Sequence, residues 1–399
     1  MNHLSLALLI GVGLVSAART SAQGLGAWSS TDGFYRLEMM PSVQTTFWAG
    51  DSPHPALVDA PDDVFLAPRL QLETSAALGS HLFLHANARW DRGFDTGNEP
   101  DGEVRVDELF ARWRFFEDER LSLQVGKFPT VFGAWVAQHD FFDDPFLLPP
   151  LAYSQVIGIQ SRDATAMTPQ AMADRADGSA PAFANLSKQN WSSIIWGPSY
   201  ASGLALSGST SRWDYAFEVK NAALSSHSDA WSPQGEVFSR PTVSARAGFR
   251  PNAAWAFGLS GSHGNYLNEA VHDLDQTTLG LDSRWAHHHW MISGEVIATR
   301  FETASAGHLD ALAWHLQARY KLAPGLWLAA RGGQLLCNSS NGPAGTPVRW
   351  SPDVWRVELA LGWHLSPNIL LKLDYSLTRT NGTFPAGEHL LGLGFGWRL

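Results

Sequence analysis

The stretch WRVELALGWHL, residues 355–365, changes from apolar to polar at nearly every step. Its odd-numbered positions carry Trp355, Val357, Leu359, Leu361, Trp363 and Leu365. Between them lie Arg356, Glu358 and His364. Because successive side chains of a strand point to opposite faces, this period of two predicts a β-strand with one apolar and one polar face.

The same alternation recurs from about Phe34 to the C-terminus, as in LFLHANARW (82–90) and RWDYAFEVK (212–220). A soluble antiparallel sandwich also alternates, but here aromatic residues sit near strand ends on the apolar parity, as in the interfacial girdle of a membrane barrel. They are Trp90, Trp113, Trp213, Trp255, Trp285, Trp290, Trp314, Tyr320, Trp355 and Trp397. We therefore expect an all-β fold, a transmembrane antiparallel up-and-down β-barrel.

The first residues predict export. A short polar start leads into the apolar stretch 4–18 and then into ARTSAQ, where cleavage after Ala22 would leave Thr20 and Ala22 at the two small positions. A retained amphipathic segment is the alternative. No apolar run reaches the 18 or so residues of a membrane-spanning helix. We expect residues 1–22 to be a signal peptide and 23–399 to form one barrel domain in the outer membrane of a Gram-negative bacterium.

Short and long connections alternate along the chain, and bacterial barrels keep tight turns on the periplasmic side and longer loops outside. Tight turns are expected near 79–80, 117–119, 209–211, 251–252, 287–288, 323–325 and 366–368. Longer connections cover roughly 48–62, 94–103, 129–192, 222–239, 266–275, 303–308, 339–352 and 380–387. They join about 16 strands, or about 18 if the tract after Pro129 hides another pair.

Composition excludes several function classes. A formal net charge of -10 argues against nucleic acid as a partner, because binding phosphates requires a basic face. The single cysteine, Cys337, leaves no internal disulfide to form. The run His287–His289 could capture a metal, but without a carboxylate or cysteine at suitable spacing a solvated turn is the better interpretation. No hydrolase, metalloprotease or nucleotide-binding motif is present, so we expect no catalytic residues, metal, cofactor or enzymatic activity.

The polar parity should line a water-compatible bore, since about 16 strands leave a channel unless something fills it. We expect the connection 129–192 to fold inward as a constriction loop, because its aromatic residues would be costly to expose. Basic residues outnumber acids on the polar parity. Arg69, Arg89, Arg112 and Arg114 are predicted to line the pore as a basic patch, across the bore from Asp140, Asp143 and Asp144. Pairing of these arginines with Glu73 and Glu108 as wall scaffolding is the alternative.

Several strings resemble porins of the phosphate-selective porin O/P group. They are DELFARWRFFEDERLSLQVGKFPTVFGAW (107–135), GLALSGSTSRWDYAFEVKNAA (203–223), LGLDSRWAHHHWMISGEVIA (279–298) and VELALGWHLSPNILLKLDYSLTRTN (357–381). The resemblance implies trimers of 16-stranded barrels with an inward third loop. Phosphate selection in that group uses an arginine ladder and a cluster of loop lysines, whereas this loop carries Arg162 and Lys188 far apart.

The sequence thus predicts a porin, a water-filled channel for passive diffusion of small hydrophilic solutes or ions, with a mild anion preference. The expected partners are outer-membrane lipid, small hydrophilic solutes or anions, and two further copies of the chain in a homotrimer. A structural or adhesive outer-membrane barrel with a plugged lumen is the alternative, and an enzyme ranks third.

Overall fold

The structure is a computed structural model that describes residues 26–51, 54, 62–92, 102–160, 167–176, 191–228, 241–267, 274–381 and 388–399. The expected signal peptide, residues 1–22, lies outside these ranges. Arg162 and Lys188 of the long connection also lie outside them. The signal peptide and its cleavage therefore stay predictions.

Sixteen strands form one closed ring in which every neighbouring pair is antiparallel. They are β2 (Tyr35–Gly50), β3 (Val64–Leu78), β4 (Leu82–Asp91), β5 (Glu103–Arg114), β6 (Ser122–Phe128), β7 (Ala201–Ser209), β8 (Trp213–Lys220), β9 (Thr242–Phe249), β10 (Trp255–Asn265), β11 (Asp275–His287), β12 (Trp290–Glu302), β13 (His308–Ala323), β14 (Leu326–Cys337), β17 (Val354–Ser366), β18 (Ile369–Thr380) and β19 (His389–Arg398).

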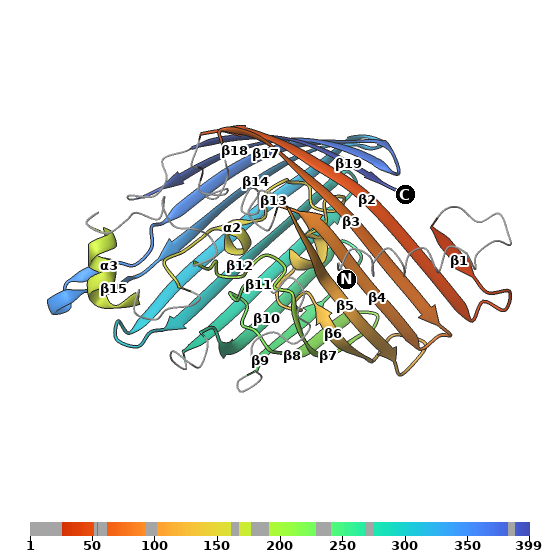
Figure 1. Ribbon diagram of the computed structural model, residues 1–399, viewed down its shortest axis with the longest axis horizontal. Coiled ribbons are helices and arrows are strands. Elements are labelled where there is room, and N and C mark those ends of the chain that lie inside the picture. The colour runs from red at the N-terminus through yellow and green to blue at the C-terminus, as the bar shows by residue number, and fades with distance from the viewer. Residues whose placement is uncertain are drawn as a thin grey trace, which may run out of the picture.

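The ring closes where its first and last strands meet. β19 pairs with β2 from Leu390 opposite Gly50 to Arg398 opposite Ser42. The short β1 (Ala27–Ser29) pairs with the first residues of β2, before the stretch that pairs with β19, and Trp28 lies opposite Leu37. Figure 1 shows the tilted strands, with β1 and the C-terminus towards the same end of the barrel.

The expected connections fit this ring. The tight turns join β3–β4, β5–β6, β7–β8, β9–β10, β11–β12, β13–β14 and β17–β18. The prediction of about 16 strands is confirmed. The alternative of about 18 is wrong, because the described part of the tract after Pro129 contains no ring strand before β7.

Each strand presents its apolar parity to the outside of the ring. On β17, Leu359 is 52% exposed and Trp363 is 50% exposed, whereas Arg356 and Glu358 on the other parity are 1% and 2% exposed. A soluble sheet would bury the apolar set, since exposing it to water costs about 25 cal/mol per Å². The exposed apolar surface therefore suits a hydrocarbon environment, as the alternation predicts.

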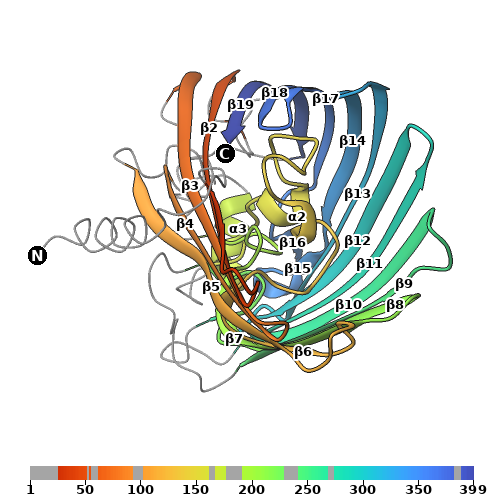
Figure 2. The same ribbon diagram turned by 90° about the vertical axis from the view of Figure 1, so that its right-hand side faces the viewer.

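The long connection between β6 and β7, residues 129–200, is called the third loop below. It contains η1 (Val136–Gln138), α2 (Leu151–Ser154) and α3 (Pro169–Ala176). Figure 2 shows α2 and α3 within the ring. The connection between β14 and β17 forms a small hairpin, β15 (Ser339–Asn341), η5 (Pro343–Gly345) and β16 (Pro347–Arg349), and α3 contacts β16. No helix in the described ranges is long and apolar enough to cross a membrane.

One part of the inner face departs from the sequence prediction. Ile297, Phe301, Leu309 and Leu335, on the inner faces of β12, β13 and β14, are at most 1% exposed. They pack in one cluster with apolar residues of the third loop. The expectation of a water-compatible inner face is therefore wrong on this side, where the lumen holds an apolar core.

Candidate functional site

Buried carboxylates of the ring bind the start of the third loop. Glu218 of β8 accepts a hydrogen bond from the Val131 amide at 3.1 Å. Glu295 of β12 accepts one from the Ala134 amide at 2.9 Å and another from the Tyr153 hydroxyl at 2.7 Å. The two carboxylates are 1% and 3% exposed. Burying a charge is costly unless it is hydrogen-bonded, so these contacts fix both the carboxylates and the loop backbone.

Buried cations of β14, β17 and β18 bind the middle of the loop. Each donates to a loop carbonyl: Arg331 to Leu148, Lys372 to Asp144 at 2.5 Å and Arg356 to Pro149 at 3.2 Å. Asp374 accepts the Leu147 amide at 2.7 Å between them. The three cations are 1–2% exposed. These bases, which the polar parity assigns to the pore wall, therefore hold the loop and do not face solute.

The inner face of β19 provides the surface on which the loop side chains lie. Its inward residues are Gly392, Gly394 and Gly396, called the glycine face below. A Cβ at Gly396 would lie 2.5 Å from Phe141 Cε1, and one at Gly392 would lie 2.7 Å from Leu147 Cδ1. The Lys372 ammonium lies 4.5 Å from the centroid of the Phe141 ring. The absence of side chains on β19 thus lets the loop approach the wall closely.

The wall formed by β3, β4 and β5 faces this loop with a network of ion pairs. Arg69, Arg89 and Arg105 each lie 3.0 Å from an oxygen of Asp91. Arg89 also lies 3.0 Å from Asp107. Only Arg69 reaches solvent appreciably, with its side chain 35% exposed against 9% for Arg89 and 5% for Arg105. We call these five residues the arginine wall.

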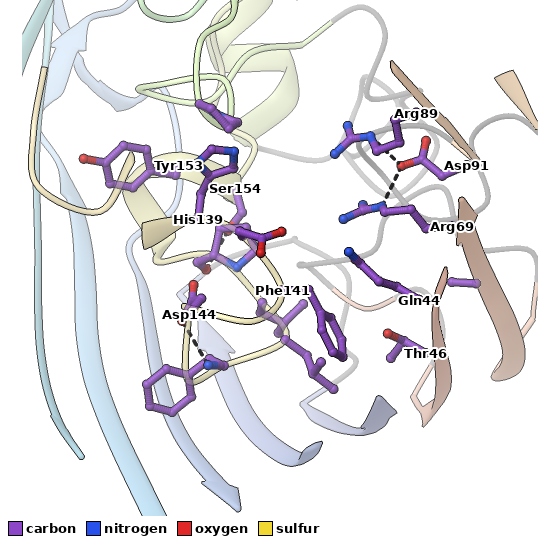
Figure 3. Close-up of a pocket in the computed structure, with 18 of the residues that line it drawn as sticks. Gln44, Thr46, Arg69, Arg89, Asp91, His139, Phe141, Asp144, Tyr153 and Ser154 are labelled. Carbon is purple, nitrogen blue, oxygen red and sulfur yellow. Dashed lines mark hydrogen bonds and ion pairs between the residues drawn. The ribbon is translucent and has the colours of Figure 1, made fainter. Parts of the chain in front are cut away.

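A cavity of about 180 Å³ separates the arginine wall from the loop. Gln44, Thr46, Arg69 and Arg89 line it from the ring, and Phe141 is among the residues that line it from the loop. In Figure 3 the guanidinium groups of Arg69 and Arg89 point from the ring towards the loop. We call this space the loop–wall cavity.

Of the residues predicted to line the pore, Arg69, Arg89, Asp140 and Asp144 line the loop–wall cavity. The structure does not bring Arg112 and Arg114 to it. They line a separate cavity of about 550 Å³, together with Glu119 and Arg246. Asp143 is exposed and lines neither cavity. The four arginines therefore do not form one continuous patch.

Two loop residues at the cavity are held by internal bonds. Asp144, 5% exposed, accepts the Trp135 indole N–H at 2.7 Å, and burial raises the pKa of its carboxyl. Burial lowers the pKa of His139, whose Nδ1 lies 2.6 Å from the Val136 carbonyl oxygen and whose Nε2 lies 2.6 Å from the Tyr200 hydroxyl. A neutral ring that donates from Nδ1 and accepts at Nε2 satisfies both contacts.

Sequence parity missed Arg105 and Asp107 because β5 contains a bulge. The register between β4 and β5 shifts between Asn87 and Ala88. Both Asp107 and Glu108 consequently lie on the inner side, and the residues before them change parity. A signal is present in the sequence, since the apolar positions run Val104, Val106 and then Leu109. That step from even to odd numbers marks the bulge.

No protein-family model matches the sequence, and no curated protein matches it significantly. Three solved structures are similar: OmpF of Salmonella typhi in complex with daunomycin (TM-score 0.59, 12% identity, 93% of this chain and 100% of that one), the channel DcaP of Acinetobacter baumannii (0.58, 10%, 94% and 100%) and the anion-selective porin of Comamonas acidovorans (0.55, 12%, 91% and 99%).

The chain shares its fold with outer-membrane porins and channels. At these identities the likeness concerns the barrel and does not extend to solutes. The structures do not identify the phosphate-selective O/P group that the sequence resembles. Within the described ranges, no group of three or more His, Cys, Asp or Glu residues is arranged to hold a metal ion.

The contacts of Arg331 predict that its loss will release the third loop. Arg331→Met removes the donor to the Leu148 carbonyl. It also removes the ion-pair partner of Glu358, which lies 2.6 Å from Arg331 in the unsubstituted protein, and so leaves a buried unpaired charge. Such a change costs about 3–5 kcal/mol. We expect faster chymotrypsin cleavage of the folded barrel within residues 129–160, measured by mass spectrometry of the fragments.

Arg112→Met is the matched control, because Arg112 donates to Gln124 of the ring and makes no described contact with the loop. The double variant Arg331→Met/Glu358→Leu removes the unpaired charge and should recover part of the protection. Equal cleavage rates for the two single variants would contradict the anchoring role of Arg331.

The glycine face predicts a position-specific cost of adding side chains. Gly394→Val would place its Cβ 2.8 Å from Leu147 and 3.1 Å from Phe141, so the loop must shift. We expect a destabilisation of about 1–3 kcal/mol, typical of overpacking, in urea unfolding followed by tryptophan fluorescence. Gly332→Val is the control, since a Cβ there meets no heavy atom within 4 Å. Equal midpoints for the two variants would refute close packing at β19.

Proposed function

We propose that the protein is a porin of the Gram-negative outer membrane, a channel through which small hydrophilic solutes or ions diffuse passively. The observation that carries the proposal is the loop–wall cavity, because the loop binds one side of the ring and leaves a polar space against the other. Further cavities of about 440 and 550 Å³ are lined by inward residues of the ring such as Arg246. A diffusion channel requires these spaces to be connected, which conductance measures.

The third loop acts in this proposal as the constriction. Its anchors lie on β8, β12, β14, β17 and β18, which draws its backbone away from β3 and β4. The rival hypothesis, a structural or adhesive barrel with a plugged lumen, requires the loop to contact the ring on all sides. The side lined by Arg69 and Thr46 favours an open route.

A mild anion preference follows from the arginine wall. Its three arginines pair with Asp91, with Asp107 and, at 3.9 Å, with Glu103, so the preference depends on which charge reaches the cavity. Arg69 is the most exposed of the three arginines. A fixed positive charge in a narrow, low-dielectric passage raises the local concentration of anions. Assembly as a homotrimer in outer-membrane lipid remains part of the same proposal.

Planar-bilayer recording in a KCl gradient tests the channel and its preference together. We expect stable conductance steps with a reversal potential shifted towards that of chloride. Arg69→Gln should reduce the shift, because it removes the exposed charge from the loop–wall cavity. Arg112→Gln, the same charge change in the cavity of about 550 Å³, should have a smaller effect, since water and salt screen a charge in the larger space more. A silent barrel would overturn the channel function, and equal reversal potentials for the two variants would overturn the role of Arg69.

A row of Ser75, His85 and Glu108 on neighbouring strands raises the question of catalysis. The Ser75 hydroxyl lies 2.9 Å from His85 Nδ1, and Glu108 lies 4.0 Å from Nε2. In a serine hydrolase the nucleophile contacts Nε2 and the acid holds Nδ1, the reverse of this arrangement. The distance to Glu108 also exceeds a hydrogen bond. We interpret Ser75 and His85 as a cross-strand hydrogen-bonded pair in the lumen wall, with Glu108 nearby.

The absence of enzymatic activity stays a prediction with a direct test. The refolded barrel should hydrolyse neither short-chain esters nor casein. A fluorophosphonate probe should leave Ser75 unlabelled, because no activated nucleophile is available to it. Mass spectrometry of the labelled peptide provides the measurement, with Ser75→Ala as the control. A covalent adduct at Ser75 would favour a hydrolase instead.

A further inference from the structure

The loop–wall cavity is lined by polar and apolar side chains. Its polar side, on the ring, carries Gln44, Thr46, Arg69 and Arg89, with Trp48 of β2 next to them. Its apolar side, on the loop, is formed by Phe141, Phe146, Leu147 and Leu148, beside the polar residues His139, Asp140 and Asp144. A bare inorganic ion can use only the polar groups. A solute with both a charged and an apolar part can also use the apolar loop residues.

Arg69 is the group on the polar side that can bind a solute. It donates Nε to Asp91 at 3.0 Å, which fixes the orientation of the guanidinium, and its side chain remains 35% exposed. Figure 3 shows its terminal nitrogens directed into the cavity. A guanidinium that is held at Nε presents its two terminal N–H groups in the fork geometry that matches a carboxylate. The wall therefore favours a planar anion over a spherical one.

Phe141 is held in place on the apolar side. Its ring lies over the glycine face, within 3.1 Å of the Cβ that Gly394 lacks. It also contacts Phe142 in an edge-to-face pair with centroids 5.6 Å apart. Trp48, on the neighbouring strand β2, is 5% exposed and packs with Leu148. A rigid aromatic surface gains more from a flat apolar partner than from a flexible one, because less rotational freedom is lost.

Resting on the channel function proposed above, we propose that this cavity is a binding site for small arenecarboxylates, with the carboxylate at Arg69 and the ring against Phe141. The acid Asp140 lines the same cavity but accepts the Phe142 amide at 3.3 Å within its own turn. Its charge opposes the bound anion and keeps binding weak. Weak binding suits a transport route, since the solute must also leave.

Sodium benzoate added to single channels in KCl tests the site. Benzoate should interrupt the current in a concentration-dependent manner at millimolar levels. Acetate, which lacks the ring, and benzyl alcohol, which lacks the charge, should not. Arg69→Gln and Phe141→Leu should each raise the half-blocking benzoate concentration roughly fivefold or more, the scale expected for losing one charged or aromatic contact. Asp140→Asn should lower it.

Two controls separate the site from the channel itself. Arg112→Gln carries the same charge change outside the cavity and should leave benzoate block unchanged. Phe141→Leu keeps an apolar side chain at the position, and chymotrypsin cleavage within residues 142–160 at the rate of the unsubstituted barrel would show that the loop remains docked. Block by benzoate equal to that by acetate, or block unaffected by both Arg69→Gln and Phe141→Leu, would overturn the inference and leave the channel function standing. A barrel without conductance steps would overturn the channel function.

Discussion

The arrangement of the lumen depends on hydrogen bonds between buried charges of the ring and the backbone of the third loop. Carboxylates of Glu218, Glu295 and Asp374 accept loop amides, and Arg331 and Lys372 donate to loop carbonyls. The loop segment they hold has little regular secondary structure, so its backbone groups have few partners of their own. Without these hydrogen bonds, the buried peptide groups of the loop and the buried charges of the ring would both lack partners, at a cost in free energy.

This pairing explains why most charged residues of the inner face are neutralised within the protein. Removing two opposite charges from water costs several kcal/mol for each ion, and only good geometry with further hydrogen bonds offsets that cost. Arg331 meets the condition, since it contacts Glu358 through two nitrogens and the Leu148 carbonyl as well. Charges that are paired with each other and bonded to the loop are neutralised. The electrostatics of the proposed channel therefore depend on the few groups left partly exposed, above all Arg69.

The strands and turns could be predicted from sequence because the information is local. The period of two in β17 or β19 follows from which side chains can face lipid, and tight turns must fall where alternation stops. The docking of the loop could not be predicted in the same way. Which carboxylate meets Ala134, or which lysine meets Asp144, depends on a path through the lumen that no short segment encodes. The same holds for Arg112, whose parity is inward but whose position along β5 lies beyond the cavity.

The last strand shows how one pattern can serve two purposes. In LGLGFGWRL (391–399) the apolar residues face outwards, and the alternation by itself gives the intervening glycines no role. Their inner surface instead receives Phe141 and Leu147, so the loop lies against β19 and the space remains at β3 and β4. Larger inward residues on β19 would move the loop towards Arg69 and reduce that space. The position of the loop–wall cavity thus depends on where the ring lacks side chains as much as on where it carries charge.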